Sequence, residues 1–416
     1  MANVSSSNGL EKRPKLRFPG FDEPWNESKL SACFAKNIKK NTDGRISNVI
    51  CNSAKMGLIP QRDYFDKDIA NSDNTSGYYI IEHNDFVYNP RKSSDAPYGP
   101  ISRYAYPDAG IVSPLYLCFR AKGDEDTNFF EWYFRSSAWH RYIYMTGDSG
   151  ARHDRVSIKD DDFFSMPIRF PSSIEQKKIA SFLNAIERRI SSQQLLVDNL
   201  KKYKRGVFEA IFSRTLRLMP RTSQSEWTAF KLSDFATRIT RKNNGATDIP
   251  LTISAQYGLI DQRDFFSKVV ASTDMSGYYL LHRGEYAYNR STSNDYPFGS
   301  IKRLDLYDKG AVSTLYLCFA IKEEVVLSDF ARWYFESSQW YRGVNEICAE
   351  GARNHGLLNV PTDGFFNTVH ILPSDIEEQS RIAAFLSRIH EKVIQAQEEL
   401  DELNSLRKGL MQQLFI

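Results

Sequence analysis

The chain has 416 residues, of which 41% are hydrophobic, 13% aromatic and 25% charged. This length suits two domains or more, and the net charge of +3 argues against a globally basic nucleic-acid binder, although local basic surfaces remain possible. The sequence contains no apolar run of the roughly 18 residues that a membrane span needs, and its polar first 13 residues predict no signal peptide.

Residues 1–13 are predicted to form a disordered tail and residues 14–170 a first globular domain. Short β-like runs ("GYYII", "DFVYN", "SPLYLCF") mix there with at least one helix around Trp132 to Trp139, which indicates an α+β fold. The Trp and Tyr side chains of "WYFRSSAWHRY" are spaced for a helix face that packs on the core. Among five cysteines without a C-x-x-C pair, Cys118 and Cys318 lie in matching apolar runs and are expected to be buried. This cysteine usage favours a reduced, cytoplasmic protein.

A long helix is predicted over residues 171–213. About thirty residues lack glycine and proline, and apolar positions alternate at spacings of four and three, a heptad seam typical of a coiled coil. A Pro followed by S-x-x-E, at Ser172 and Glu175, is interpreted as a capping box at the helix start. The seam consists of Ile179, Leu183, Ile186, Ile190, Gln193, Val197, Leu200, Lys204, Val207 and Ile211.

The rest of the chain repeats this order. Residues 214–226 are predicted to be a polar linker, residues 227–372 a second domain, and residues 373–416 a second long helix that begins with S-x-x-E at Ser374 and Glu377. Its seam consists of Ile382, Leu386, Ile389, Val393, Ala396, Leu400, Leu403, Arg407, Leu410 and Leu414. The matched stretches include "GLIPQRDYF" with "GLIDQRDFF", "SGYYIIEHNDFVYNP" with "SGYYLLHRGEYAYNR", "GIVSPLYLCF" with "GAVSTLYLCF" and "EWYFRSSAWHR" with "RWYFESSQWYR". The period is that of a whole domain, longer than that of a solenoid repeat.

Each long helix would leave its seam in water if it stood alone, so we expect the two helices to pair with each other. Residues 174–212 carry eight Lys or Arg and four Asp or Glu, whereas residues 376–416 carry five and seven. Opposite charges favour this pairing. The sequence therefore predicts two similar α+β domains and an antiparallel coiled coil, related by a pseudo-twofold axis.

The order of these motifs resembles the specificity subunit (HsdS) of type I restriction-modification enzymes. "PKLRFPGF" with Trp25, Lys29 and Leu30 looks like the beginning of that family's first target-recognition domain. "PSSIEQKKIASFL" with "KRGVFEAIF", and "PSDIEEQSRIAAFL" with "RKGLMQQLF", look like its long helices. "YNPRKSSDAPYGPI" and "GARNHGLLNVP" are similar to stretches inside its recognition domains. The resemblance covers nearly the whole chain, and the first copy departs from it at "GARHDRVSIKD".

The resemblance implies that each target-recognition domain binds one half of a bipartite target in double-stranded DNA, while the helices set the spacing. It also implies two docked methyltransferase subunits and further motor-nuclease subunits. S-adenosylmethionine, ATP and Mg would belong to those partners, so this chain would hold no cofactor or metal, catalyse no reaction itself and have no membrane partner. Twofold symmetry fits inverted half-sites roughly 34 to 36 Å apart, and similar domains suggest half-sites of related sequence.

Candidate DNA contacts come from two places in each copy. The loop after "VYN" or "AYN" has a polar tip that differs between copies, while its flanks "PYG" and "PFG" repeat. Polar tips of this kind suit base edges and phosphates, or form a solvated hairpin. The "GAR" strings are the second place, or else turns anchored by Arg. The candidates are Arg91, Lys92, Ser93, Ser94, Tyr98 and Arg152 in the first copy, and Arg290, Ser291, Thr292, Asn294, Arg353 and Asn354 in the second.

Other functions have weaker support. "GDSGA" imitates the nucleophile string of a serine protease, but its repeat partner "CAEGA" has no Ser. No phosphate-binding loop, methyltransferase string or metal-ligand spacing occurs. The basic residues of the first helix fit subunit docking better than DNA contact. The alternative from another class is a coiled-coil interaction scaffold that binds no DNA, which salt-dependent duplex binding would exclude.

Overall fold

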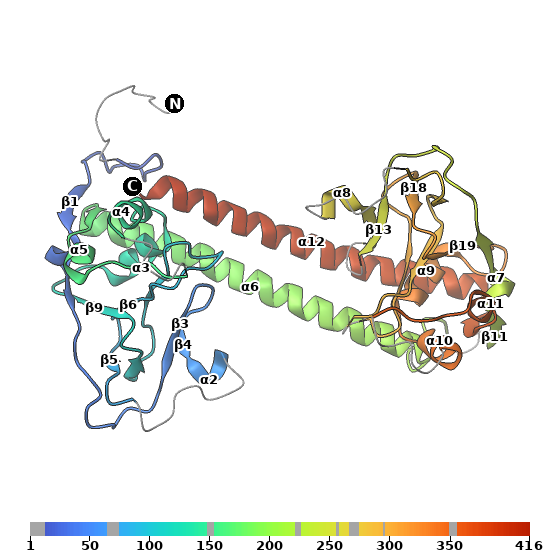
Figure 1. Cartoon of the computed structure of the whole chain (residues 1–416), viewed down its shortest axis with the longest axis horizontal. Helices are drawn as coiled ribbons and strands as arrows, with labels where there is room; N and C mark the ends of the chain where they lie inside the picture. Colours follow the sequence, from blue (N-terminus) through green and yellow to red (C-terminus); the bar gives the residue numbers. More distant parts are fainter. Residues whose placement is uncertain are drawn as a thin grey trace. The chain divides into compact units, whose positions relative to one another are not determined.

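The computed structural model describes residues 13–64, 75–147, 154–220, 226–254, 258–265, 274–293, 296–348 and 356–416. The chain divides into two compact units, namely unit 1 (residues 1–194 and 398–416) and unit 2 (residues 195–397). Each unit takes part of two long helices, α6 (Ser173–Phe212) and α12 (Ile376–Leu414) (Figure 1). Apart from Arg13, the predicted tail lies outside the described residues.

The described part of unit 1 contains an antiparallel four-stranded sheet in the order β2-β9-β6-β7, and the two-stranded pairs β1-β10, β3-β4 and β5-β8. Apart from α6, its elements are β1 (Asn26–Lys29), α1 (Leu30–Cys33), β2 (Phe34–Lys36), β3 (Ile50–Ser53), β4 (Gly57–Pro60), α2 (Gln61–Tyr64), β5 (Tyr79–Ile81), β6 (Phe86–Tyr88), β7 (Ile101–Arg103), β8 (Gly110–Val112), β9 (Leu117–Ala121), α3 (Thr127–Arg135), α4 (His140–Thr146), α5 (Asp160–Phe164) and β10 (Pro167–Phe170).

The described part of unit 2 repeats this plan, with a sheet in the order β12-β19-β16-β17 and the pairs β11-β20, β13-β14 and β15-β18. The matching order confirms the α+β class and the internal repeat. Apart from α12, its elements are β11 (Trp227–Lys231), α7 (Leu232–Phe235), β12 (Ala236–Ile239), β13 (Leu251–Ser254), β14 (Gly258–Asp261), α8 (Gln262–Phe265), β15 (Tyr279–His282), β16 (Tyr286–Asn289), β17 (Ser300–Arg303), β18 (Lys309–Val312), β19 (Leu317–Ile321), α9 (Ser328–Glu336), α10 (Tyr341–Ile347), α11 (Thr362–Phe366) and β20 (Val369–Pro373).

Aromatic side chains fill the space between sheet and helices in each unit. In unit 1 the rings of Phe86 and Phe119 stack at 5.5 Å, and in unit 2 those of Tyr286 and Phe319 stack at 5.3 Å. The tryptophans of the "WYF" helices are buried, as the helical spacing predicts, and so are Cys118 and Cys318. Burial raises the pKa of both thiols to about 12, so neither is a reactive nucleophile at neutral pH.

The long helices run antiparallel where they meet within each unit. A later residue of α6 faces an earlier residue of α12, which confirms the predicted direction of pairing. The polar pairs that show this are Glu187–Arg407 and Arg189–Glu399 in unit 1, and Lys201–Gln397 and Lys204–His390 in unit 2. The predicted seam positions are buried or half-buried along both helices. At the helix ends, seam residues such as Ile179 and Ile382 also belong to the domain cores.

The capping-box interpretation of the helix starts is wrong. Glu175 is fully buried, and its carboxylate accepts two hydrogen bonds of 2.8 Å from the Arg17 guanidinium. In the second copy the predicted Glu377 accepts from Arg381 at 2.6 Å. The next residue, Glu378, corresponds to Glu175 in the repeat and accepts from Arg217 at 2.9 Å. Glu175 and Glu378 are thus buried carboxylates, each of which a half-buried arginine neutralises. At α12 the cap comes instead from Asp375, whose carboxylate accepts from a main-chain amide of the first turn.

Residues 214–220 of the predicted linker pair with the end of a long helix in unit 2, as residues 14–20 do in unit 1. The Leu16 amide donates to the carbonyl of Gln413 near the end of α12, and the Leu216 amide donates to the carbonyl of Ala210 near the end of α6, at 3.0 and 2.9 Å. Each segment thereby satisfies a carbonyl that the last helical turn leaves open. Part of the linker is thus an ordered piece of the repeated unit.

Candidate nucleic-acid interface

The loop that joins β6 to β7 has a fixed backbone. The Asn89 amide donates to the Pro100 carbonyl at 3.0 Å, and a turn closes through the Gly99 amide on the Ala96 carbonyl at 3.1 Å. Gly99 has φ +80°, and a Cβ built there would lie 2.1 Å from the Asn89 carbonyl oxygen. Only glycine fits such a left-handed position at this distance. The loop therefore presents its tip in one conformation.

A buried amide ties this loop to the β3-β4 hairpin. Asn52 is 5% exposed, and its Nδ2 donates to the carbonyls of Val87 at 2.8 Å and Pro100 at 3.3 Å. Its Oδ1 accepts from the Ser102 hydroxyl at 2.7 Å, and its carbonyl accepts from the Asn89 side chain at 3.1 Å. A buried polar side chain satisfied in this way positions its neighbours closely.

On its other side the loop pairs with the chain that follows residue 153. The Lys92 amide donates to the Asp154 carbonyl at 2.8 Å, and the Val156 amide to the Pro90 carbonyl at 2.9 Å. Arg91 and Arg155 face each other as an antiparallel bridge. The predicted contacts of the β6-β7 loop thus lie beside the segment that directly follows the first "GAR" string. Arg152 itself lies outside the described residues.

A cleft of about 580 Å³ opens in unit 1 between the β3-β4 hairpin, this loop and the turn over residues 113–116. Among the described residues, the cations Lys55, Arg91, Lys92 and Arg155 line it together with one acid, Asp95, which lies 3.7 Å from the Lys55 ammonium. Arg91, Ser93 and Ser94 are exposed and Lys92 is half-buried. A cleft with an excess of cations attracts a polyanion and concentrates it at the loop.

Unit 2 has the same loop frame with different side chains. Gly299 has φ +78°, and its Cβ would lie 2.2 Å from the Asn289 carbonyl oxygen. The Thr292 amide donates to the Gly356 carbonyl at 2.7 Å, and Ser291 is bridged to Leu357. Hydroxyl side chains therefore stand where unit 1 has Arg91 and Lys92. Asn294, Arg353 and Asn354 lie outside the described residues.

Arg290 lies within the fold of unit 2. Its guanidinium donates to the carbonyl of Leu315 at 2.9 Å and to that of Val360 at 3.4 Å. It thus joins the loop to the turn over residues 313–316, at the position that Pro90 occupies in unit 1. This placement gives Arg290 a structural role, and a contact with DNA stays a prediction.

Tyr98 packs inside unit 1. Its ring lies 5.0 Å from the ring of His140 on α4, and its carbonyl accepts from the Tyr88 hydroxyl at 2.9 Å. Burial lowers the pKa of His140, so this imidazole is neutral near pH 7. Phe298 packs on Tyr341 in the same way in unit 2, at 5.2 Å. The aromatic residue thus supports the loop by packing on α4 in unit 1 and on α10 in unit 2, and a contact of Tyr98 with DNA stays a prediction.

Comparison with known families gives a match over the first part of the chain. Residues 29–200 match the family described as "Type I restriction modification DNA specificity domain". This part of the chain is therefore similar to the DNA specificity domain of type I restriction-modification systems. This finding confirms the family that the sequence resembles. No curated protein matches the sequence.

Solved structures share the fold of this chain. It is similar to the S subunit of the type I restriction-modification system from M. genitalium, with 13% identity, a TM-score of 0.56, and coverage of 97% of this chain and 99% of that one. It is also similar to a chain described under "complex assembly" and "conformational transition of the type I R-M system", with 15% identity, a TM-score of 0.55, and coverage of 95% and 98%. At these identities the likeness concerns the fold.

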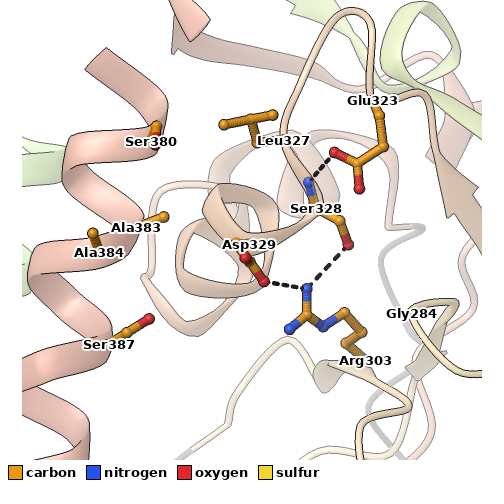
Figure 2. Close-up of a pocket in the computed structure, with 10 residues that line it drawn as sticks. All are labelled: Gly284, Arg303, Glu323, Leu327, Ser328, Asp329, Ser380, Ala383, Ala384 and Ser387. Carbon is orange, nitrogen blue, oxygen red and sulfur yellow. Dashed lines mark hydrogen bonds and ion pairs between the residues drawn. The ribbon is translucent and has the colours of Figure 1, made fainter. Parts of the chain in front are cut away.

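A second pocket, of about 340 Å³, lies in unit 2, beside α12. Figure 2 shows the Arg303 guanidinium directed toward Asp329 and Ser328, opposite the small side chains of α12. Arg303 donates to Asp329 at 2.8 Å and to the Ser328 hydroxyl at 3.2 Å, while Glu323 accepts from the Ser328 amide at 3.0 Å. Because these groups satisfy one another, we assign the pocket no role in DNA reading. Among the described residues, no cluster of three or more His, Cys, Asp or Glu could hold a metal, and no helix is long and apolar enough to cross a membrane.

Sequence reasoning missed the hairpin side of the cleft. Asn52 and Lys55 belong to "CNSAKMG", directly before the repeated "GLIPQRDYF", and Arg155 follows the first "GAR" string. The available signal was the position of "SAKMG" and "SAQYG" as polar turns between β-like runs. Nothing in the spacing indicated that this hairpin lies beside a loop almost forty residues later, because that contact is tertiary.

Proposed function

We propose that this chain is the DNA sequence-recognition subunit of a type I restriction-modification complex, and that each unit binds one half of a bipartite target in double-stranded DNA. The observation that carries the proposal is the loop frame common to both units. Main-chain hydrogen bonds hold one backbone, on which polar tips of different chemistry stand. A fixed backbone with exchangeable polar side chains suits the reading of base edges and phosphates.

In unit 1 we assign phosphate contacts to the cations of the cleft, Arg91, Lys92 and Lys55, because cations on both walls would accommodate a backbone strand between them. Ser93 and Ser94 at the tip are the base-edge candidates. In unit 2, Ser291 and Thr292 would contact the DNA through their hydroxyl groups. The shared frame favours half-sites of related sequence, and the different tips favour half-sites that are not identical.

We further propose that α6 and α12 set the distance between the half-sites and dock two methyltransferase subunits, with motor-nuclease subunits joining for cleavage. Exposed apolar side chains on α6, at Leu195, Leu196 and Tyr203, suit such a docking surface. The chain itself would catalyse no reaction. S-adenosylmethionine, ATP and Mg would be bound by the partners.

The test is to map methylated adenines in a host that carries this chain with its methyltransferase subunits. We expect one bipartite motif, and exchange of residues 14–170 for another recognition domain should change one half of it only. A change in both halves would contradict the assignment of one half-site to each unit. The purified complex should also bind its target with log affinity falling linearly with log salt. Absence of salt-dependent duplex binding would favour the coiled-coil scaffold that binds no DNA.

A further inference from the structure

An exposed leucine stands at the same turn of each unit. Leu115 in unit 1 and Leu315 in unit 2 are each 60% exposed. Neither belongs to the hydrophobic clusters that the described residues form. Single exposed leucines are common on protein surfaces, so exposure alone indicates nothing. The position of these two leucines in the fold is more informative.

Both leucines are held in place by their turns. The Leu115 amide donates to the Ser113 hydroxyl at 3.3 Å, and the Tyr116 amide donates to the Ser113 carbonyl at 3.0 Å. In unit 2 the Leu315 amide donates to the Ser313 hydroxyl, also at 3.3 Å. A leucine on a fixed turn loses little backbone entropy when it contacts a ligand.

Both leucines also lie beside the polar loop. Leu115 lines the cationic cleft of unit 1 together with Arg91 and Lys92. In unit 2 the Leu315 carbonyl accepts from the Arg290 guanidinium, so its turn is joined to the corresponding loop. The loop tips differ between the units, whereas the leucine is the same. A side chain retained next to a changed tip indicates a contact that both units share.

We propose that Leu115 and Leu315 each contact the 5-methyl group of a thymine in the half-site that their unit binds. This inference rests on the proposed function. The thymine methyl is the apolar group that base pairs present in the major groove, where all the other recognition groups are hydrogen-bond donors or acceptors. The two half-sites would accordingly share a T·A pair at equivalent positions.

An apolar side chain can also act on DNA as a wedge between base steps. A wedge has to project beyond its neighbours to enter the base stack. Leu115 instead belongs to the lining of the cleft, with Tyr116 and Arg91. A base edge that borders the cleft can therefore reach Leu115. The cleft therefore favours methyl contact over wedging.

The test uses the complex of this chain with its methyltransferase subunits and a duplex that carries the mapped target. Each thymine of the target is replaced singly by deoxyuridine, which removes only the methyl group, and affinity is measured for the wild-type chain, Leu115→Ala and Leu315→Ala. We expect one deoxyuridine in each half-site to weaken wild-type binding about fourfold, the value of one buried methyl-sized group. Leu115→Ala should weaken binding to a similar extent and make the deoxyuridine in its own half-site silent.

Leu306→Ala is the matched control. Leu306 is 59% exposed but follows Arg303, at the opposite end of the β16-β17 ladder from the loop that follows Asn289. This variant should bind like the wild-type chain and keep both deoxyuridine effects. It shows whether loss of any exposed leucine weakens binding.

Three results would overturn the inference. The first is a half-site that contains no thymine. The second is that, at every thymine, the loss of affinity from deoxyuridine is the same in Leu115→Ala as in the wild-type chain. The third is base unstacking in the wild-type complex that Leu115→Ala abolishes. The last result, read by 2-aminopurine fluorescence, would establish a wedge. Failure of the proposed function looks different, because the wild-type complex would then show no target-selective, salt-dependent binding at all.

Discussion

The loop after β6 in unit 1 and the loop after β16 in unit 2 have the same backbone but different charge. Both close through a left-handed glycine, Gly99 or Gly299, and both pair with the chain that follows the "GAR" string. Unit 1 presents Arg91 and Lys92, whereas unit 2 presents hydroxyl groups. Because the hydrogen bonds that fix the frame are mostly main chain to main chain, side chains at the tip can change without loss of the fold. Specificity can thus diverge on a constant scaffold.

The contacts between the long helices differ in a similar way. Glu187 in unit 1 corresponds in the repeat to His390 in unit 2, and Arg407 corresponds to Lys204. Burial raises the pKa of Glu187, but the guanidinium groups of Arg407 and Arg135 outweigh this effect and lower its pKa overall. The unit 1 pair is therefore an ion pair at neutral pH. The unit 2 pair joins a cation to a neutral imidazole.

The largest expected effect comes from breaking the shared frame. Gly99→Ala places a Cβ 2.1 Å from a carbonyl oxygen in a left-handed conformation, so the loop has to move. We expect affinity for the target to fall more than about 100-fold and stability by about 2–4 kcal/mol, as for a strained backbone position with a steric clash. Duplex titration and denaturant unfolding of the complex measure the two quantities.

Gly299→Ala should have a similar effect on the half-site of unit 2. Gly77→Ala and Gly277→Ala are the controls, because a Cβ at either position meets nothing within 4 Å. Normal target binding by Gly99→Ala would show that the loop conformation does not matter to recognition.

A smaller effect should follow when the tip of unit 1 receives the residues of unit 2. Arg91→Ser with Lys92→Thr removes two cations and keeps the frame. If both contact phosphate, the slope of log affinity against log salt falls by about 1.8, and affinity at 0.1 M salt falls by roughly tenfold for each cation. Ser291→Arg with Thr292→Lys should steepen the slope.

Arg45→Ser provides the control for net charge, since this arginine is 85% exposed and does not belong to the cleft lining. If Arg45→Ser reduced the slope as much as the double exchange, the difference between the units would reflect overall charge alone. The position of the loop would then carry no information.

The sequence predicted the features that recur along it and missed those that depend on distant contacts. The seam positions, the buried "LYLCF" strands and the "WYF" helices follow from periodicities of seven, two and about four residues, which local structure enforces. Glu175 was misinterpreted because S-x-x-E describes a cap equally well. Its true partner, Arg17, lies 158 residues away. The offset of 200 between "KLRF" and "TLRL" could have revealed both arginines.

In the candidate site, too, the repeated features were predicted and the distant contacts were not. The loop tips were found because they differ between copies while their flanks repeat. The placement of Arg290 against Leu315 and Val360 could not be predicted, because its side chain reaches carbonyls 25 and 70 residues away. From sequence alone, an arginine in a polar loop is expected to be a surface cation, and only the folded structure shows which groups it contacts.

The smallest expected effect concerns the helix pair of unit 2. His390 faces Lys204, Lys302, Arg332 and Glu336, and its ring lies 5.1 Å from that of Trp333. Burial and the neighbouring cations lower the pKa of His390 to about 4. Between its unfolded pKa of about 6.5 and the folded value, the unfolded chain binds one more proton than the folded chain, so stability falls as pH falls. Because solvent screens the half-exposed ring, the slope should be well below the single-proton limit of about 1.4 kcal/mol per pH unit.

His390→Glu rebuilds the unit 1 pair in unit 2. At pH 7 the new carboxylate beside Lys204 should stabilise the protein by at most about 1 kcal/mol, as for a partly exposed ion pair. Because a carboxylate paired with a cation titrates below pH 5, the part of the acid sensitivity between pH 6.5 and 5 that His390 causes should disappear. The part caused by buried His370, whose pKa is also lowered to about 4 by burial, should remain.

His390→Gln separates the gain from the new ion pair from the loss of the titrating imidazole, since it removes the titrating group without adding charge. Urea unfolding at pH 5, 6 and 7 would therefore give His390→Gln the flattened pH profile without the gain at pH 7, and a wild-type slope in that variant would rule out His390 as the group responsible.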